Sequence, residues 1–153
     1  MIIRSSLPTD APGISRVLTA LTDAGLRVSP SDIDFVLSNY IENPNGIECS
    51  VATDPEGFIL GFQSLLLAVE GNQYGATPGW GIIGTHIHPE AIRQGIGGKL
   101  FAVTRQAALN ASLKYIDATI QNYNTGGLAY YESVGFRTYE TIEGAVRKVY
   151  DLN

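Results

Sequence analysis

The residues best suited to chemistry lie in residues 88–100, where an expected strand ends, glycines follow and a helix begins. The first turn of a helix has free N–H groups, and the helix dipole directs positive potential toward its N-terminus. This arrangement suits a phosphate or diphosphate. The charged and flexible residues of the turn are Arg93, Gly95, Gly97, Gly98 and Lys99. The stretch therefore favours a cofactor that carries a diphosphate, although a glycine turn before an ordinary core helix has the same composition.

Two well-known phosphate loops do not fit this stretch. A dinucleotide-binding fingerprint that starts at Gly95 needs glycine at the position of Leu100. A P-loop needs glycine where Arg93 stands, and serine or threonine at Leu100. The turn is thus neither of these two motifs.

Strands and helices alternate along the chain and must position this turn. In the first half, a strand is expected over Ile2–Arg4, a helix from Thr9 or Asp10 to Ala24, another from Ser31 to a turn at 43–46, and strands over Ile47–Thr53 and Phe58–Val69. In the second half, strands are expected over Trp80–His88, Leu113–Ile120, from Gly135 and over Ala145–Leu152, with helices over Gly97–Asn110 and Gly126–Ser133. This order predicts an α/β (α+β) domain with a mixed, partly antiparallel sheet and helices on both faces.

Length and composition limit the functions that this domain can have. The 153 residues, 44% apolar and 16% charged, suit one domain over 1–153 with a real core. A net charge of -5 argues against a nucleic-acid partner. A single cysteine, Cys49, excludes an intramolecular disulfide and a cysteine-based zinc cluster. The lack of a long apolar run and of a signal-peptide pattern predicts a soluble, cytoplasmic protein without a membrane partner.

The glycine turn resembles the first signature of the GNAT (GCN5-related N-acetyltransferase) superfamily, Gln/Arg-x-x-Gly-x-Gly/Ala after a strand that often ends in His-Pro. Gly95-Ile96-Gly97 fills its glycine half, and Ile87-His88-Pro89 fits the strand end. The Gln/Arg position falls on Ile92, and Arg93 takes the next position, which is often glycine. Because such a turn binds phosphate mainly through backbone N–H groups, this departure is tolerable.

A second stretch, Asn124 to Phe136, resembles the second signature of the same superfamily. Its pattern is an asparagine, a small residue three positions later, a tyrosine at seven, and Gly-Phe four beyond that. Gly127 takes the small position, which is usually alanine, and Tyr131 takes the tyrosine position. The chain's opening also resembles the family's usual start, so the resemblance covers essentially the whole chain.

The resemblance implies a GNAT fold with about seven strands, in which the fourth and fifth strands splay apart and acetyl-CoA binds in the gap. Ile87 would offer backbone groups to the pantetheine, and residues 93–98 would hold the pyrophosphate with Lys99 adding charge. Asn124 would face the cofactor. The cofactor-binding residues that the resemblance implies are Ile87, Arg93, Gln94, Gly95, Ile96, Gly97, Gly98, Lys99, Asn124 and Gly127.

Tyr131 takes the position of the family's general acid, which protonates the departing thiolate. A phenol suits this role because its usual pKa, about 10, exceeds the roughly 8.5 of a thiol. The glutamate that many relatives place in the fourth strand is absent, and His86 is the nearest titratable side chain. His86 could be the general base, directly or through water, or a structural histidine. His86 and His88 alone are too few ligands to predict a metal site.

The expected reaction is transfer of an acetyl group from acetyl-CoA to a primary amine of a small molecule or amino acid. The stretch between Arg27 and Arg93 has no lysine or arginine and eight acidic residues, which favours a cationic acceptor over an acidic one unless that surface is merely solvated. A protein or peptide N-acetyltransferase and a non-catalytic acyl-CoA-binding sensor are the alternatives. A homodimer is possible.

Overall fold

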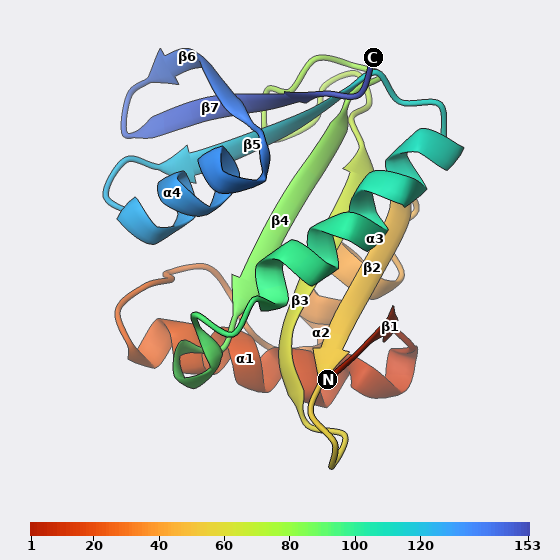
Figure 1. Ribbon diagram of the computed structural model, residues 1–153, viewed down its shortest axis with the longest axis vertical. Coiled ribbons are helices and arrows are strands. Elements are labelled where there is room, and N and C mark those ends of the chain that lie inside the picture. The colour runs from red at the N-terminus through yellow and green to blue at the C-terminus, as the bar shows by residue number, and fades with distance from the viewer.

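The computed structural model describes residues 1–153 and contains seven strands and four α-helices (Figure 1). The strands are β1 (Ile2–Ser5), β2 (Gly46–Thr53), β3 (Ile59–Leu67), β4 (Gly81–Ile87), β5 (Tyr115–Gln121), β6 (Arg137–Ile142) and β7 (Ala145–Asp151). The helices are α1 (Ala11–Asp23), α2 (Ile33–Val36), α3 (Ile96–Asn110) and α4 (Thr125–Val134), with the short 3₁₀ helices η1 (Pro8–Asp10) and η3 (Pro89–Ala91) and the π-helix η2 (Leu37–Ile41). The order of elements is the one expected from the sequence. None of the helices is long and apolar enough to cross a membrane.

All seven strands form one mixed sheet in the order β1-β2-β3-β4-β5-β7-β6. Every neighbouring pair is antiparallel except β4 and β5, which run parallel and pair only at Gly81 with Ile116 and at Ile82 with Asp117. Beyond Ile82 the two strands diverge (Figure 1). This confirms the mixed sheet and the splayed central strands.

The divergence leaves one edge of β4 without a partner strand. On its other edge β4 pairs with β3 without a register shift, and the His88 N–H donates to the Leu60 carbonyl at 2.8 Å. Backbone groups of alternate residues point to opposite edges of a strand. Ile83, Thr85 and Ile87 therefore direct their N–H and carbonyl groups into the gap between β4 and β5.

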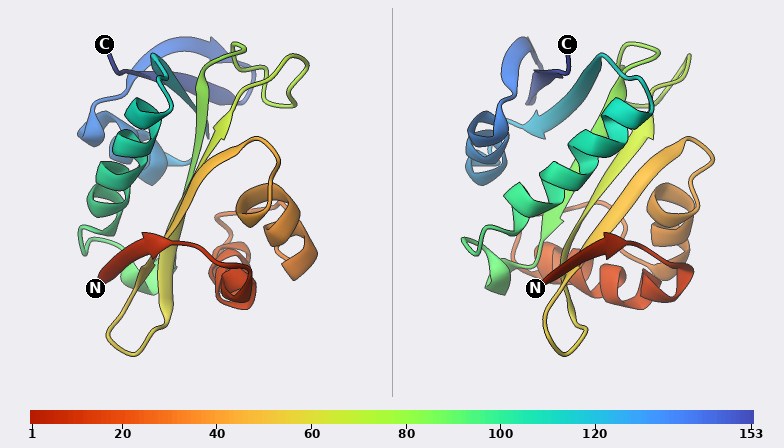
Figure 2. Two further views of the ribbon diagram at one scale, coloured as in Figure 1. Left: turned by 90° about the vertical axis from the view of Figure 1, so that its right-hand side faces the viewer. Right: turned by 45° about the vertical axis from the view of Figure 1, so that its right-hand side comes forward.

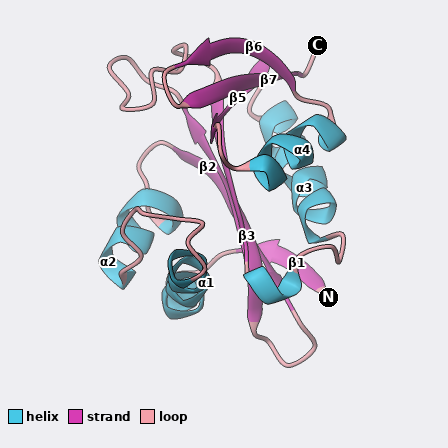
Figure 3. Ribbon diagram, turned by 90° about the vertical axis from the view of Figure 1, so that its left-hand side faces the viewer, coloured by secondary structure: helices cyan, strands magenta, loops and turns pink.

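The helices cover both faces of the sheet, as Figures 2 and 3 show: α1 and α2 lie on one face, α3 and α4 on the other. Buried residues of α1 and α2 pack on β2 and β3 in a cluster that includes Ile14, Leu18 and Phe62. A second cluster joins α3 and α4 to β5 and includes Phe101 and Tyr131. Successive side chains of β4 point to opposite faces of the sheet, so Ile83 packs in the second cluster while His86 stacks on Phe62 of the first.

The first helix begins directly after Asp10, as predicted, but without a side-chain cap there, and the second begins two residues later than predicted. Asp10 stands at the N-cap of α1 but its carboxylate accepts two hydrogen bonds of 2.8 Å from Arg4 and one from the Leu7 N–H, so it ties β1 to η1. The Arg4 guanidinium holds the pKa of Asp10 below its usual value. The second helix begins at Ile33 rather than Ser31, because the Asp32 side chain caps it at the Phe35 N–H.

Candidate active site

The turn between β4 and α3 presents the free N–H groups expected of an anion site. Arg93 and Gly95 both have left-handed backbones, with φ of 65° and 75°, and Gly95 is the N-cap of α3. The first-turn N–H groups of Ile96, Gly97 and Gly98 have no carbonyl partner within the helix. Residues with a side chain rarely adopt this conformation, so the backbone of Arg93 is strained. A glycine at position 93 would adopt it without strain. The turn can bind a diphosphate through its backbone.

Positive charge accompanies the turn, as the sequence indicated. Arg93 and Lys99 are exposed, and neither forms an ion pair within 4.0 Å. Ile96, by contrast, is 2% exposed and packs with Ala52 and Leu100, so only its backbone can face a ligand. The two cations are therefore free to neutralise phosphate oxygens at the helix N-terminus.

Gly97 and Gly98 differ in what a side chain would meet. A Cβ at Gly97 would lie 2.5 Å from a ring carbon of Tyr130, whose hydroxyl donates to the Gly97 carbonyl at 2.8 Å. A Cβ at Gly98 would meet nothing within 4 Å. The sequence placed Gly97 among the cofactor-binding residues, and the structure adds a second reason for glycine there, since α4 packs on α3 through Tyr130. Gly98, like Gly95, leaves open space in which a ligand can lie.

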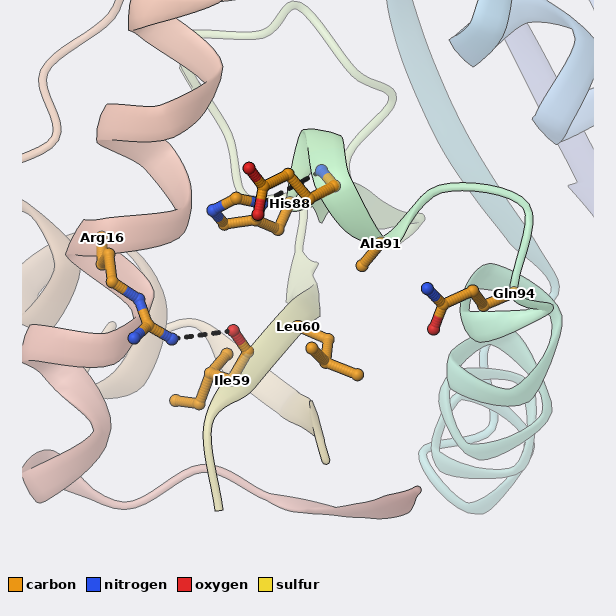
Figure 4. A pocket seen from close by; sticks show the side chains of 7 residues that line it. Arg16, Ile59, Leu60, His88, Ala91 and Gln94 are labelled. Carbon is orange, nitrogen blue, oxygen red and sulfur yellow. Dashed lines mark hydrogen bonds between the residues drawn. The ribbon is translucent and has the colours of Figure 1, made fainter. Parts of the chain in front are cut away.

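Gln94 lies on the other side of the turn and lines a cavity of about 320 Å³ (Figure 4). The cavity is lined by Arg16, Ile59, Leu60, His88, Glu90, Ala91 and Gln94. Arg16 donates to the Ile59 carbonyl at 3.2 Å, and the His88 Nδ1 accepts from the Glu90 N–H at 3.1 Å. No residue of β5 or α4 lines this cavity, and the Gln94 side chain points into it.

Tyr131 reaches from α4 into the gap. It is 6% exposed, and its hydroxyl lies 2.8 Å from the Thr85 hydroxyl on β4. Burial raises the pKa of Tyr131 well above its usual range, and hydrogen bonding by Thr85 lowers it only in part. The phenol is therefore protonated throughout the neutral pH range and can act as a hydrogen-bond or proton donor at the free edge of β4.

His86 lies on the opposite face of β4, within the aromatic residues of the α1–α2 side. Its ring stacks on Phe62 with centroids 4.8 Å apart, and Tyr40 packs on it edge-on. Arg27 Nη1 lies 3.1 Å from His86 Nε2, and because a guanidinium only donates, Nε2 is the acceptor. Burial, and secondly the charge of Arg27, lower the pKa of His86 to about 3. This arrangement does not suit the general base that the sequence suggested, since the basic nitrogen is engaged and weakly basic.

The low pKa of His86 predicts a specific loss of stability in acid. The unfolded chain binds a proton at His86 with a pKa near 6.5, whereas the folded chain does so near 3. The stabilisation is thus complete above about pH 6.5 and is lost as the pH falls toward 3, by about 2 kcal/mol between pH 6.5 and 5. Urea unfolding at pH 7 and pH 5 should show this loss for the wild type and a smaller one for His86→Gln. Equal losses in the two proteins would contradict the assignment.

Asp117 on β5 is the carboxylate nearest the point where β4 and β5 separate. It is fully buried, and both of its oxygens are engaged: Oδ1 accepts from Thr119 at 3.0 Å, and Oδ2 accepts from the Tyr139 hydroxyl and from Arg147 at 3.5 Å. These contacts join β5, β6 and β7. Asp117 is therefore a structural group in this arrangement.

Asn124 and Gly127 serve the start of α4. The Asn124 Oδ1 accepts from the Gly127 N–H at 2.9 Å, which is a helix N-cap. A Cβ at Gly127 would lie 2.6 Å from Asn124 Nδ2. The asparagine and the small residue of the second motif thus orient the helix that carries Tyr131. The exposed side-chain nitrogen of Asn124 has no protein partner and remains free for a ligand.

The polar residues Gln63, Thr85 and Arg27 of this region were not identified from the sequence. Gln63 on β3 pairs directly with Thr85 on β4, and its Nε2 donates to the Thr85 hydroxyl at 2.9 Å and to the Tyr130 hydroxyl at 3.0 Å. Arg27 comes from the loop between α1 and α2. A glutamine within the largely apolar stretch 59–67 was the available sequence signal for Gln63. No sequence pattern placed Arg27 beside His86.

The sequence profile of the Acetyltransferase (GNAT) family matches residues 17–136, which contain both motifs and the gap between β4 and β5. The chain belongs to the GNAT acetyltransferase family. GNAT enzymes use acetyl-CoA. Comparison with curated proteins gives no significant match.

Solved structures share this GNAT fold over nearly the whole chain. A GCN5-related N-acetyltransferase from Kribbella flavida aligns with a TM-score of 0.78 and 17% identity, covering 98% of this chain and 96% of that one. A ribosomal-protein-alanine N-acetyltransferase from Brucella melitensis aligns with a TM-score of 0.80 and 18% identity, covering 99% of both chains. A candidate acetyltransferase from Salmonella typhimurium, solved with its cofactor acetyl-CoA, has a TM-score of 0.75 and 16% identity and covers 99% and 94%. Identities this low establish the fold alone.

The residues around the gap fit an acyl-CoA. The pantetheine arm has amide groups that can pair with the free N–H and carbonyl groups of Thr85 and Ile87, as an added strand would. The diphosphate would lie at the N-terminus of α3 beside Gly98 and the two free cations. In addition, the Gln63 Oε1 is buried without a hydrogen-bond partner and can accept one from a ligand.

Proposed function

We propose that this protein transfers an acetyl group from acetyl-CoA to the primary amine of a small molecule or amino acid. The observation that carries the proposal is Tyr131, a buried phenol whose hydroxyl stands at the free edge of β4 with Thr85. When bound, acetyl-CoA supplies an activated acetyl thioester. The residues of the chain then have three tasks: to hold the thioester, to admit the amine and to protonate the departing sulfur.

The two faces of β4 divide these tasks. The helices α3 and α4 cover one face of β4, and Tyr131 lies on that face. The turn at the start of α3 would hold the phosphates there. The amine must therefore approach from the α1–α2 face, where His86, Tyr40 and Arg27 lie. Thr85 and Ile87 orient the acyl-CoA by backbone contacts, and Tyr131 donates its proton to the thiolate. Because His86 is a weak base bonded to Arg27, the proton released by the amine goes to water.

The proposal is tested by following thiol release from acetyl-CoA with a panel of free amino acids, diamines and short peptides. We expect turnover with small primary amines, with one acetyl group added to the acceptor as seen by mass spectrometry. Preferential acetylation of peptide N-termini would support the peptide alternative. Tight acetyl-CoA binding without turnover on any acceptor would support the sensor alternative.

Arg27 refines the expected acceptor. The acidic residues counted between Arg27 and Arg93 form no ion pair with Arg27, and the groups bonded to its guanidinium are His86, the Pro30 carbonyl and Tyr40. Its Nε is buried without a partner. A guanidinium without a counter-ion on the acceptor face favours an amine that also carries a carboxylate, as an amino acid does. The charge of Arg27 thus favours an acceptor with a carboxylate, whereas the acidic stretch between Arg27 and Arg93 suggested a cationic acceptor.

Arg27→Met should therefore raise the KM for an amino acid about 10- to 100-fold, which corresponds to a lost charged hydrogen bond, and leave the KM for the decarboxylated amine unchanged. The methionine keeps much of the side chain's packing against Phe35. Steady-state kinetics with an amino acid and its decarboxylated counterpart provide the comparison. An equal rise in KM for both substrates would show that Arg27 only holds the loop.

A further inference from the structure

A chain of hydrogen bonds links the glycine turn to Tyr131 through Gln63. The Tyr130 hydroxyl donates to the Gly97 carbonyl, Gln63 Nε2 contacts the hydroxyls of Tyr130 and Thr85, and the Thr85 hydroxyl contacts that of Tyr131, all at 2.8 to 3.0 Å. The chain crosses from α3 through α4 and β3 to β4. Its central residue, Gln63, is fully buried.

The available protons constrain the direction of this chain. A hydroxyl has one proton, and that of Tyr130 goes to the Gly97 carbonyl, so the Tyr130 oxygen accepts from Gln63. The second Nε2 proton goes to the Thr85 oxygen. Either hydroxyl of the Thr85–Tyr131 pair can donate to the other. When a ligand accepts the Tyr131 proton, the Thr85 proton goes to the Tyr131 oxygen, and every donor of the chain then has an acceptor.

The opposite orientation of the Gln63 amide is less favourable. It would leave two buried N–H groups of Gln63 without an acceptor, whereas the observed orientation leaves only the Oε1 acceptor without a partner. It would also reverse the chain, so that Tyr131 would donate to Thr85 and its proton would be engaged. The observed orientation of the Gln63 amide therefore permits the arrangement in which the phenol proton is available to a ligand, and the opposite orientation does not.

We propose that Gln63 is a positioning residue that, through Thr85, keeps the Tyr131 hydroxyl proton directed at the sulfur of bound coenzyme A. This inference rests on the proposed function, since it assumes that coenzyme A binds in the gap. A donor fixed at the sulfur stabilises the thiolate relative to the thiol and so lowers the thiol pKa of the bound ligand. That pKa can be measured without any acceptor.

Gln63→Glu is the decisive variant because it has the same shape and only accepts hydrogen bonds when ionised. The glutamate accepts hydrogen bonds from the hydroxyls of Tyr130 and Thr85. The Thr85 oxygen then accepts from Tyr131, so the Tyr131 proton is no longer available to a ligand. Thr85→Val breaks the same link without placing a charge in the core, and Tyr131→Phe removes the final donor. Tyr150→Phe is a matched control because it removes a hydroxyl from the same aromatic cluster away from the gap.

Coenzyme A is the probe, and its dissociation constant is measured by calorimetry from pH 6 to 10, together with thermal unfolding of each variant. The pH dependence of binding gives the thiol pKa in the complex. We expect Gln63→Glu, Thr85→Val and Tyr131→Phe each to weaken thiolate binding about tenfold relative to thiol binding, which is a pKa rise of about one unit. Tyr150→Phe should match the wild type.

Non-additivity is the second expected result. Thr85→Val or Gln63→Glu should change nothing further in a Tyr131→Phe background, because both act through the same hydroxyl. An unchanged thiol pKa in Thr85→Val, or a further change in the double variants, would overturn the positioning role even if Gln63→Glu did not fold. Failure of the wild type to bind coenzyme A would instead overturn the proposed function.

Discussion

Tyr131→Phe is expected to slow the acetyl-transfer step about 10²- to 10⁴-fold, which is the usual cost of losing general-acid assistance. The ring remains in the cluster with Phe136 and Tyr130, so acetyl-CoA affinity and the thermal midpoint should stay near the wild-type values. Single-turnover kinetics with acetyl-CoA and the best amine of the acceptor panel measure the chemical step directly.

Tyr150→Phe serves as the control for this experiment, because its hydroxyl contacts Arg105 at the surface rather than β4. It should keep the wild-type rate. An undiminished rate in Tyr131→Phe would show that the thiolate takes its proton from solvent. A parallel fall in rate, affinity and stability would show that Tyr131 is a packing residue.

Gly98→Glu is expected to weaken coenzyme A binding about 10- to 100-fold while the fold is retained. A Cβ at this position meets no protein atom, and a carboxylate in the first turn of α3 interacts favourably with the helix dipole. The same carboxylate repels a diphosphate at the helix N-terminus, and at a few ångströms this repulsion amounts to about 1 to 3 kcal/mol. Calorimetry with coenzyme A measures the loss.

Two further variants separate the effect of the charge at position 98 from the effect of its size and from the packing of Gly97. Gly98→Gln has the size of glutamate without its charge, so it should weaken binding less. Gly97→Ala should lower the free energy of unfolding by about 1–3 kcal/mol, because its methyl group collides with Tyr130. Unchanged coenzyme A affinity in Gly98→Glu would place the diphosphate elsewhere.

Local sequence patterns predicted the order of elements and the glycine turn, and the resemblance to the family identified the second motif. Glycines at a strand end and an apolar helix face are features of neighbouring residues. They correctly placed the turn before α3 and the helix that carries Tyr131. The splayed strands came from the resemblance to the family rather than from periodicity.

The roles of individual side chains depended on contacts between distant segments, which the sequence did not show. Gly97 needs to be glycine because of Tyr130, which lies 33 residues further along the chain. His86 is made a weak base by its core environment and by Arg27, 59 residues away. Gln63 acquires its importance only from its direct pairing with Thr85 across two strands.

Acetyl-CoA is expected to occupy the gap between β4 and β5 with its diphosphate at the start of α3. The most direct test is nuclear magnetic resonance of the isotope-labelled protein titrated with acetyl-CoA. The backbone amides of Thr85 and Ile87 and of the first turn of α3 should shift together and saturate at one stoichiometric equivalent, while those of the edge strands β1 and β6 stay in place. Shifts confined to the cavity around Arg16 and His88, or none at saturating acetyl-CoA, would contradict it.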